Sequence, residues 1–321
     1  MRLLVITAAA AALLAGPAAA ERYSAESVVI EDAAAIIEII PESRTDLDVS
    51  VAAGARLPAP QVRLEGSRIV IDGDLRLQGC RRDSVRVRGV GAVRRDQLPR
   101  ITIRTPQTIN VSMGGASFAA IGPSEGGRLA MTGCGVAAMG PVRGDLNVSL
   151  TGSGDLSVAG VSGALSAALT GSGDLSVDSA GADAALRLTG SGDLRIGRIG
   201  GALEGRLTGS GDLSAGDVGG GAELVLTGSG DARTGAVRGP FSAQLTGSGD
   251  VLAESVTGEA ATLRSSGSAD VSVRGGRVSR LNVRTGGSGG VHFGGVAERA
   301  DVELRGSGDV RIAEAGQVER M

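Results

Sequence analysis

Aspartate residues recur along the second half of the chain at almost equal intervals. The tetrapeptide Gly-Ser-Gly-Asp ends at most of them, and the first six follow one another in steps of nineteen residues. We call this set the aspartate ladder: Asp155, Asp174, Asp193, Asp212, Asp231, Asp250, Asp270 and Asp309. Equally spaced carboxylates can bind a divalent cation, act as acid and base in cleaving a polysaccharide, or accept hydrogen bonds that stabilise turns.

The residues around each aspartate favour a structural role for the ladder. We expect both glycines of the tetrapeptide to adopt positive φ at a tight corner, where the Ser and Asp side chains accept hydrogen bonds from N–H groups of the turn. Two carboxylates ~5 Å apart in water repel each other by only about 0.8 kcal/mol. A charge-assisted hydrogen bond contributes roughly 1.5–3 kcal/mol, which offsets that repulsion. The ladder can therefore exist without any ligand.

Calcium binding is the second interpretation of the ladder. Stacked carboxylates and turn carbonyls are ligands that Ca²⁺ accepts, and Asp174, Asp193 and Asp212 are the candidate residues. The calcium-binding β-roll, however, has the signature Gly-Gly-x-Gly-x-Asp in a repeat of nine residues. The repeat here has nineteen. We expect no bound cofactor, and a metal site is the weaker alternative.

Catalysis is the third interpretation, because clustered aspartates on a β-helix can cleave polysaccharides. An active site needs a unique constellation, whereas these aspartates occupy near-identical surroundings. His292 is the single histidine, and it aligns with outward-facing positions of other repeats. No Ser/His/Asp arrangement can be assembled around it. The sequence therefore predicts a protein that is not an enzyme.

The nineteen-residue period defines the elements that position the ladder. Apolar residues alternate before each tetrapeptide, as in Leu165, Ala167 and Leu169, and again after it. A third apolar column occurs once per repeat at Val142, Val161, Ala180, Ile199, Val218, Val237 and Val256. Twofold alternation with glycine at fixed points indicates short strands and not helices. We predict an all-β fold, with a parallel β-helix over residues 109–321 and about 19 residues per coil.

Aromatic residues are scarce, which fits a narrow interior filled by small aliphatic side chains. The chain has three Phe, one Tyr and no Trp among 321 residues. At ~4.8 Å between stacked strands there is little room for rings above rings. Phe241 and Phe293 fall in inward columns, so we expect both to be buried.

Residues 21–108 lack the period and contain shorter strand-like runs divided by Gly, Pro and Asp. These runs could be irregular first coils of the β-helix or a small separate β-domain. Either arrangement would cap the open end of the solenoid, whose uncovered strand edges promote aggregation. We therefore predict an irregular, β-rich capping region here.

The first twenty residues have the pattern of a signal peptide. Arg2 precedes an apolar run from Leu3 to Gly16, and small residues up to Ala20 form a cleavage site. The run is shorter than the ~20 residues that a membrane span needs, and the mature chain contains no transmembrane segment. We expect export to the periplasm, the cell surface or the medium. Cys80 and Cys134 would then lie in an oxidising compartment. The sequence does not decide whether they form a disulfide or remain two free thiols.

Charge and composition exclude several partners and classes. The net charge is −3, and all 32 basic residues are Arg. That balance gives no basic footprint for nucleic acid. The 54 glycines lack the every-third-residue pattern of collagen.

The repeated Leu-Thr-Gly-Ser-Gly-Asp-Leu-Ser-Val, after a signal peptide and an irregular β-rich start, resembles a bacterial family. The family is called putative autotransporter adhesin, head GIN domain, and the resemblance covers about residues 28–315. It implies a right-handed parallel β-helix in an exported protein and offers no catalytic residues. We predict an exported, non-catalytic β-solenoid that is an adhesin-like, interaction or structural module of the cell envelope, with an envelope, glycan or protein ligand. The alternative is a polysaccharide-binding or polysaccharide-cleaving β-helix, with or without a requirement for Ca²⁺.

Overall fold

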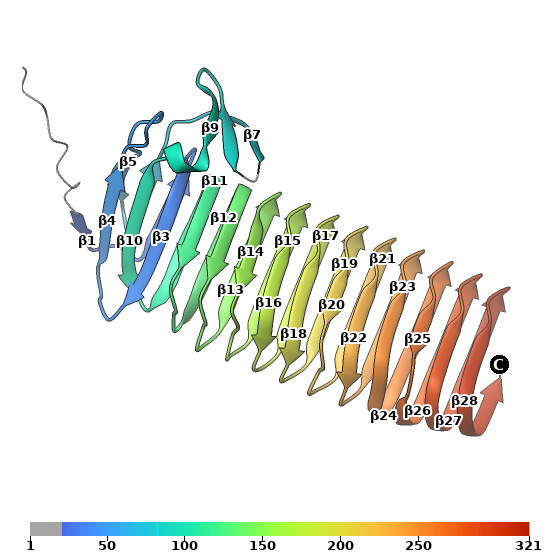
Figure 1. Cartoon of the computed structure of the whole chain (residues 1–321). Helices are drawn as coiled ribbons and strands as arrows, with labels where there is room; N and C mark the ends of the chain where they lie inside the picture. Colours follow the sequence, from blue (N-terminus) through green and yellow to red (C-terminus); the bar gives the residue numbers. More distant parts are fainter. Residues whose placement is uncertain (1–20, 82, 321) are drawn as a thin grey trace, which may run out of the picture.

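The protein is a long stack of parallel β-strand coils (Figure 1). The computed structural model describes residues 21–81 and 83–320, so the expected signal peptide at 1–20 lies outside the described residues. In the repeated part each strand pairs in parallel with its equivalent in the next coil, as Leu165 does with Ala184. The predicted all-β solenoid with coils of about 19 residues is confirmed.

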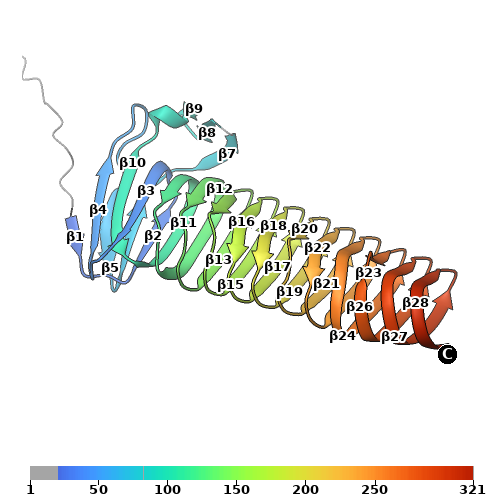
Figure 2. The ribbon, with the colours of Figure 1, turned by 60° about the horizontal axis from the view of Figure 1, so that its bottom comes forward.

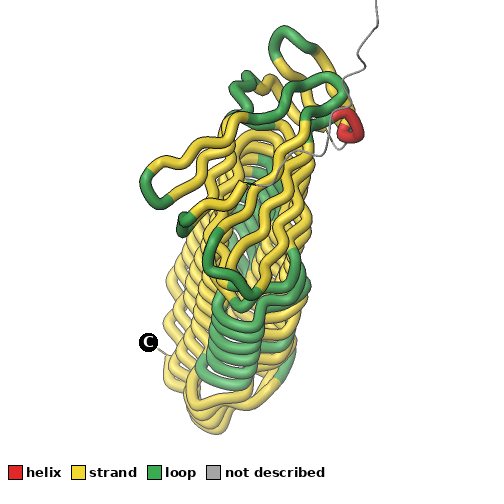
Figure 3. Tube along the Cα trace, turned by 90° about the vertical axis from the view of Figure 1, so that its left-hand side faces the viewer, coloured by secondary structure: helices red, strands yellow, loops and turns green. Residues whose placement is uncertain are grey.

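Two walls of strands run along the rod, and Figure 3 shows their coils stacked in register. The first wall holds the strands before each Gly-Ser-Gly-Asp corner: β13 (Leu146–Gly152), β15 (Leu165–Gly171), β17 (Ala184–Gly190), β19 (Leu203–Gly209), β21 (Ala222–Gly228) and β23 (Phe241–Gly247). The second wall holds those after it: β14 (Asp155–Val158), β16 (Leu175–Ala180), β18 (Leu194–Ile199), β20 (Leu213–Ala215), β22 (Ala232–Val237) and β25 (Val271–Val273).

Longer strands continue from one side of the coil to the next near both ends of the stack. They are β11 (Thr108–Ile121), β12 (Gly126–Met139), β24 (Val251–Gly267), β26 (Gly276–Gly287), β27 (Val291–Gly306) and β28 (Val310–Arg320). A third, shorter side is formed by single parallel bridges, such as the one between Val142 and Val161. Each coil therefore has three sides.

The interior is one continuous apolar column built from the inward positions of every coil. All members of the third predicted column, from Val142 to Val256, are buried. Phe241 is 2% exposed and Phe293 is 0% exposed, so the predicted inward register is confirmed. His292 is exposed on the outer surface, as its alignment predicted.

Residues 21–108 continue the stack toward the N-terminus. β2 (Ser27–Glu31) and β3 (Ala34–Glu42) pair in parallel with β11. The walls extend further through β1 (Glu21–Tyr23), β4 (Leu47–Ala52), β5 (Gln61–Glu65), β6 (Arg68–Asp72) and β10 (Arg100–Pro106). Antiparallel pairing of β4 with β10 and of β5 with β6 ends the parallel arrangement. This region therefore contains irregular first coils.

A three-stranded antiparallel sheet, which we call the flap, stands on the outside of these first coils (Figure 2). It consists of β7 (Leu77–Arg81), β8 (Ser84–Val87) and β9 (Gly91–Arg94), followed by a 3-10 turn at Arg95–Gln97. Val85 and Val93 on its inner face are buried in a separate apolar cluster that includes Phe118 of β11. Cys80 and Cys134 form a disulfide between the flap and β12, with their Cα atoms 6.1 Å apart. Apolar contact and a covalent bond thus hold the flap to the rod.

The two glycines of each corner are needed for different reasons. The first has positive φ, +123° at Gly209, and a Cβ there would overlap the carbonyl oxygen of Gly190 in the previous coil. The second, such as Gly211, has no positive φ, but a Cβ there would overlap the carbonyl oxygen of Gly192. The expectation of positive φ at both glycines is therefore wrong for the second, which is required by the close approach of coils. In one corner the second glycine is replaced by Ala269, which is buried.

We predict that Gly209→Ala destabilises the protein more than Gly211→Ala. A side chain at positive φ adds roughly 1–3 kcal/mol of backbone strain to the overlap that both variants share. Gly286→Ala is the control, because its Cβ would meet nothing nearer than the Arg305 carbonyl oxygen at 3.8 Å. Urea unfolding followed by circular dichroism measures the three losses. Equal losses for Gly209→Ala and Gly211→Ala would contradict the assigned role of φ.

Candidate functional site

The aspartate ladder is a chain of hydrogen bonds between successive coils. Oδ1 of each ladder carboxylate except Asp309 accepts the backbone N–H of the equivalent residue in the next coil, as in the 2.9 Å bond from the Asp231 nitrogen to Asp212. The bonds are 2.6–3.2 Å long, and their acceptors are Asp155, Asp174, Asp193, Asp212, Asp231, Asp250 and Asp270. The aspartates accept N–H bonds as expected, but the donors belong to the neighbouring coil and not to the same turn.

The second carboxylate oxygen of some ladder residues pairs with an arginine two residues later. Asp193 Oδ2 lies 2.7 Å from Arg195, and Asp231 Oδ2 lies 3.0 Å from Arg233. All four side chains are partly exposed, so each pair contributes only about 0–1 kcal/mol to stability. These arginines reduce the repulsion between stacked carboxylates, and the N–H bonds position the ladder.

The geometry gives little support to calcium at Asp174, Asp193 and Asp212. Oδ1 of each already accepts an N–H bond, and Asp193 also holds an arginine. Among residues 21–81 and 83–320, no group of three or more His, Cys, Asp or Glu side chains is arranged to hold a metal ion. What the ladder can do chemically is to lock the register of the coils.

The ladder is interrupted at Gly290, which occupies the aspartate position of its coil. Its N–H donates to Asp270 Oδ1 at 2.6 Å, but it has no side chain to accept the N–H of Asp309. A Cβ at Gly290 would make ordinary contacts, 3.4 Å from the Asp309 carbonyl oxygen and 3.5 Å from Asp270 Oδ1. The structure therefore has room for a side chain that would continue the ladder.

We predict that Gly290→Asn stabilises the rod. Its side-chain oxygen can accept the Asp309 N–H, and a neutral amide adds no repulsion toward Asp270. The gain over Gly290→Ala should be about 0.5–1.5 kcal/mol, the net value of one hydrogen bond. Urea unfolding of both variants and the parent chain measures it. Equal stabilities of the Asn and Ala variants would contradict the prediction.

We predict that Asp212→Ala destabilises the protein by roughly 1–2 kcal/mol, because the Asp231 N–H loses its acceptor. Asp212→Asn should retain most of the stability, since an amide oxygen can replace the carboxylate oxygen. Asp309→Ala is the matched control: it removes a ladder residue whose contact is the exposed pair with Arg311, 2.8 Å away. The same unfolding measurement applies. A loss at Asp309 as large as that at Asp212 would contradict the coil-to-coil role.

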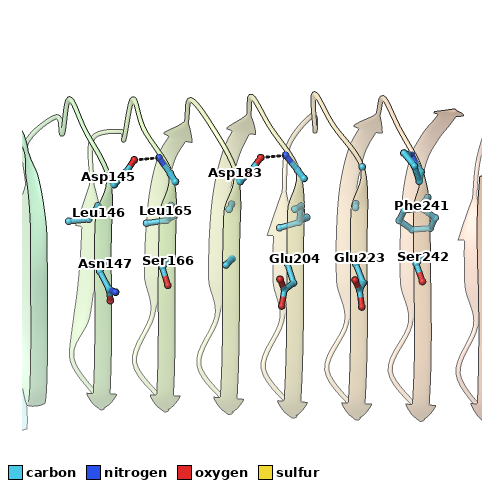
Figure 4. Close-up of a pocket in the computed structure, with 18 of the residues that line it drawn as sticks. Asp145, Leu146, Asn147, Leu165, Ser166, Asp183, Glu204, Glu223, Phe241 and Ser242 are labelled. Atoms are coloured by element: carbon cyan, nitrogen blue, oxygen red, sulfur yellow. Dashed lines mark hydrogen bonds between the residues drawn. The ribbon is translucent and has the colours of Figure 1, made fainter.

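A groove runs along the corner where the first wall begins (Figure 4). Its volume is about 1010 Å³. Equivalent positions of successive coils line it: the corner residue, the first buried residue and the first outward residue of each strand. The corner residues are Asp145, Ala164, Asp183, Ala202, Gly221 and Pro240, and the outward residues are Asn147, Ser166, Ala185, Glu204, Glu223 and Ser242. The groove is thus a repeated feature, made without irregular loops.

Two aspartates of the groove repeat the ladder bond at a second corner. Oδ1 of Asp145 accepts the N–H of Ala164 at 2.8 Å, and Oδ1 of Asp183 accepts that of Ala202 at 2.7 Å, the dashed lines in Figure 4. Sequence reasoning missed these residues. The signal that could have found them is the alternation Asp-Ala-Asp-Ala in steps of nineteen residues.

Two glutamates on neighbouring strands give the middle of the groove negative charge. Glu204 and Glu223 are direct partners in the pairing of β19 with β21, and Glu204 forms an ion pair with Arg206. The apolar part of the lining comes from the first residue of each strand, including Leu203 and Phe241. The groove therefore combines hydroxyl, carboxylate and apolar surface.

The C-terminal part of the rod is similar to a known protein family. Residues 241–316 match the family described as "Putative auto-transporter adhesin, head GIN domain". The resemblance expected from the repeated Gly-Ser-Gly-Asp-Leu is confirmed over this head GIN segment, which runs from the start of β23 into β28.

Two solved structures align with nearly the whole chain. A putative adhesin from Bacteroides fragilis NCTC 9343 is 12% identical with a TM-score of 0.21, over 94% of this chain and 96% of that one. A putative lipid binding protein from Parabacteroides distasonis ATCC 8503 is 12% identical with a TM-score of 0.28, over 96% and 98%. No curated protein matches the chain. Within the described residues, no helix is long and apolar enough to cross a membrane.

Proposed function

We propose that this chain is an exported, non-catalytic β-solenoid that acts as an adhesin-like binding module of the bacterial cell envelope. The observation that carries the proposal is the groove, because repeated positions of the rod form it. Such a surface suits binding along its length, whereas catalysis needs one constellation that differs from its neighbours. The signal-peptide pattern and the head GIN segment support export and an adhesin-like role.

Polysaccharide binding in the groove is the second candidate, and the extended form of the groove favours it. Equivalent residues such as Ser166 and Ala185 are direct strand partners, so they repeat at ~4.8 Å along the rod. A linear polymer can therefore meet one groove position at each step. Carboxylates and hydroxyls provide hydrogen bonds to sugar hydroxyls, and the apolar lining provides contact with sugar rings. Cleavage has weaker support, because Oδ1 of both Asp145 and Asp183 already accepts a backbone N–H. Of the two groove glutamates, Glu204 is held in an ion pair with Arg206.

The test is binding of the mature chain, residues 21–321, to a glycan array and to isolated envelope polysaccharide, with two matched variants. Ala185→Trp places a bulky ring in the groove, whereas Ala168→Trp places the same ring on the first wall outside it. We expect at least a tenfold loss of binding for Ala185→Trp, since the ring displaces ligand from the groove. Ala168→Trp should bind as the parent does, and circular dichroism checks that both fold.

Two results would overturn these proposals. If the chain bound no envelope component, the proposal of a binding module would be wrong. Equal binding by Ala185→Trp and Ala168→Trp would place the binding surface elsewhere on the rod.

A further inference from the structure

The flap concentrates positive charge in a protein whose net charge is negative. Among the described residues, the exposed arginines on it or at its margin include Arg76, Arg81, Arg86, Arg88 and Arg94. The alternation along β8 explains the arrangement, because every second residue faces the apolar cluster under the flap and the others face solvent. One face of the flap is thus apolar and attached to the rod, and the other is basic and free.

Strand pairing spreads these arginines over the outer face. Arg81 and Arg94 are the partners of Ser84 on its two sides, which places them in one row across the three strands. The Arg88 N–H donates to the Arg76 carbonyl oxygen at 2.9 Å, so these two residues lie opposite each other at the other end of the hairpin. Like charges opposite each other destabilise a sheet unless an anion lies between them.

Few acids neutralise this face. Arg94 pairs with Asp96 at 2.8 Å, but within the described residues Arg76, Arg81, Arg86 and Arg88 have no carboxylate within 4.0 Å. Some arginines elsewhere are fully paired, and Arg63 contacts three carboxylates. Arg187, Arg198 and Arg264 also lack a carboxylate within 4.0 Å among the described residues, but they lie on different coils of the rod. The flap differs because it gathers its unpaired arginines on one small sheet.

We propose that the outer face of the flap docks on an anionic membrane surface through lipid phosphates. Guanidinium groups bind phosphate oxygens with paired hydrogen bonds, and basic clusters bind anionic bilayers. A planar partner fits because the arginines are distributed over three strands and not along one line. The hollow of about 670 Å³ beside the flap contains two aspartates and one arginine, which disfavours a small free anion there.

This contact would orient the rod. The flap lies at the N-terminal end, and the repeated coils extend away from it (Figure 1). The disulfide between Cys80 and Cys134 fixes the flap to β12, so a docked flap would hold the first coils at the membrane. The inference rests on the proposed export only to bring the chain to a membrane, and it does not depend on what the groove binds.

The test is co-sedimentation of the mature chain with vesicles of phosphatidylcholine alone and with about one third phosphatidylglycerol. We expect binding only to the anionic vesicles, and weaker binding as salt is raised. The combined variant Arg81→Gln, Arg86→Gln, Arg88→Gln should bind about a hundredfold more weakly, because each basic residue near an anionic bilayer is worth about fivefold in affinity. The control combines Arg187→Gln, Arg198→Gln and Arg264→Gln, three exposed arginines of the rod, and should bind as the parent does.

Three outcomes would overturn the docking proposal. These are equal binding to neutral and anionic vesicles, equal losses in the flap and control variants, and flap-dependent binding to soluble dextran sulfate without binding to vesicles. The last would make the partner a polyanion in place of a membrane. Ala185→Trp, which blocks the groove, should bind vesicles as the parent does. Failure of the groove proposal and failure of membrane docking are therefore distinguishable.

Discussion

In-register pairing of the backbone from coil to coil is the constraint on which the rest of this structure depends. Leu165 pairs with Ala184, Ala184 with Leu203 and Leu203 with Ala222, so every position of the repeat stands above its equivalent. Any residue type that recurs in the sequence becomes a column in space. The apolar columns form the core, and glycine columns form the corners. The aspartate column places like charges ~4.8 Å apart, so their repulsion must be offset.

The hydrogen bond that each aspartate accepts from the next coil offsets this repulsion. A carboxylate that accepts the N–H of the coil above has its charge stabilised by a donor that stacking itself supplies. The same bond recurs at a second corner at Asp145 and at a third at Asp217, which accepts the Ala236 N–H at 3.0 Å. The same hydrogen bond, repeated at different corners, thus helps to fix the register of the coils.

Periodicity made most of the rod predictable, and its limits are physical. The inward columns, including Phe241 and Phe293, follow from alternation and a constant step. Alternation does not tell which coil donates to an aspartate, so the donor was assigned to the wrong turn. It also cannot separate a glycine needed for positive φ from one needed for close approach, as Gly209 and Gly211 show. The groove was missed because its shape depends on how each corner bends.

The first hundred residues were less predictable, because pairing there joins segments with no shared sequence. β3 lies between β10 and β11, although about sixty residues separate β3 from β10 along the chain. Alternation along a segment predicts a strand, but it does not predict with which strand that segment pairs. For the same reason the sequence left the bond between Cys80 and Cys134 open.

Repetition and irregularity divide the molecule into two kinds of surface. The coils present the same positions at every step, so their groove is long and regular although its side chains vary from coil to coil. Affinity there would grow with ligand length through multivalency. The flap is outside the repeat and can gather charge that stacking would penalise, since its arginines occupy different positions of three strands. The rod does stack arginines on neighbouring coils, as at Arg264 and Arg284 or Arg280 and Arg299. The flap instead gathers its arginines on one small sheet, and it stands at one end of the rod, where it does not cover the groove.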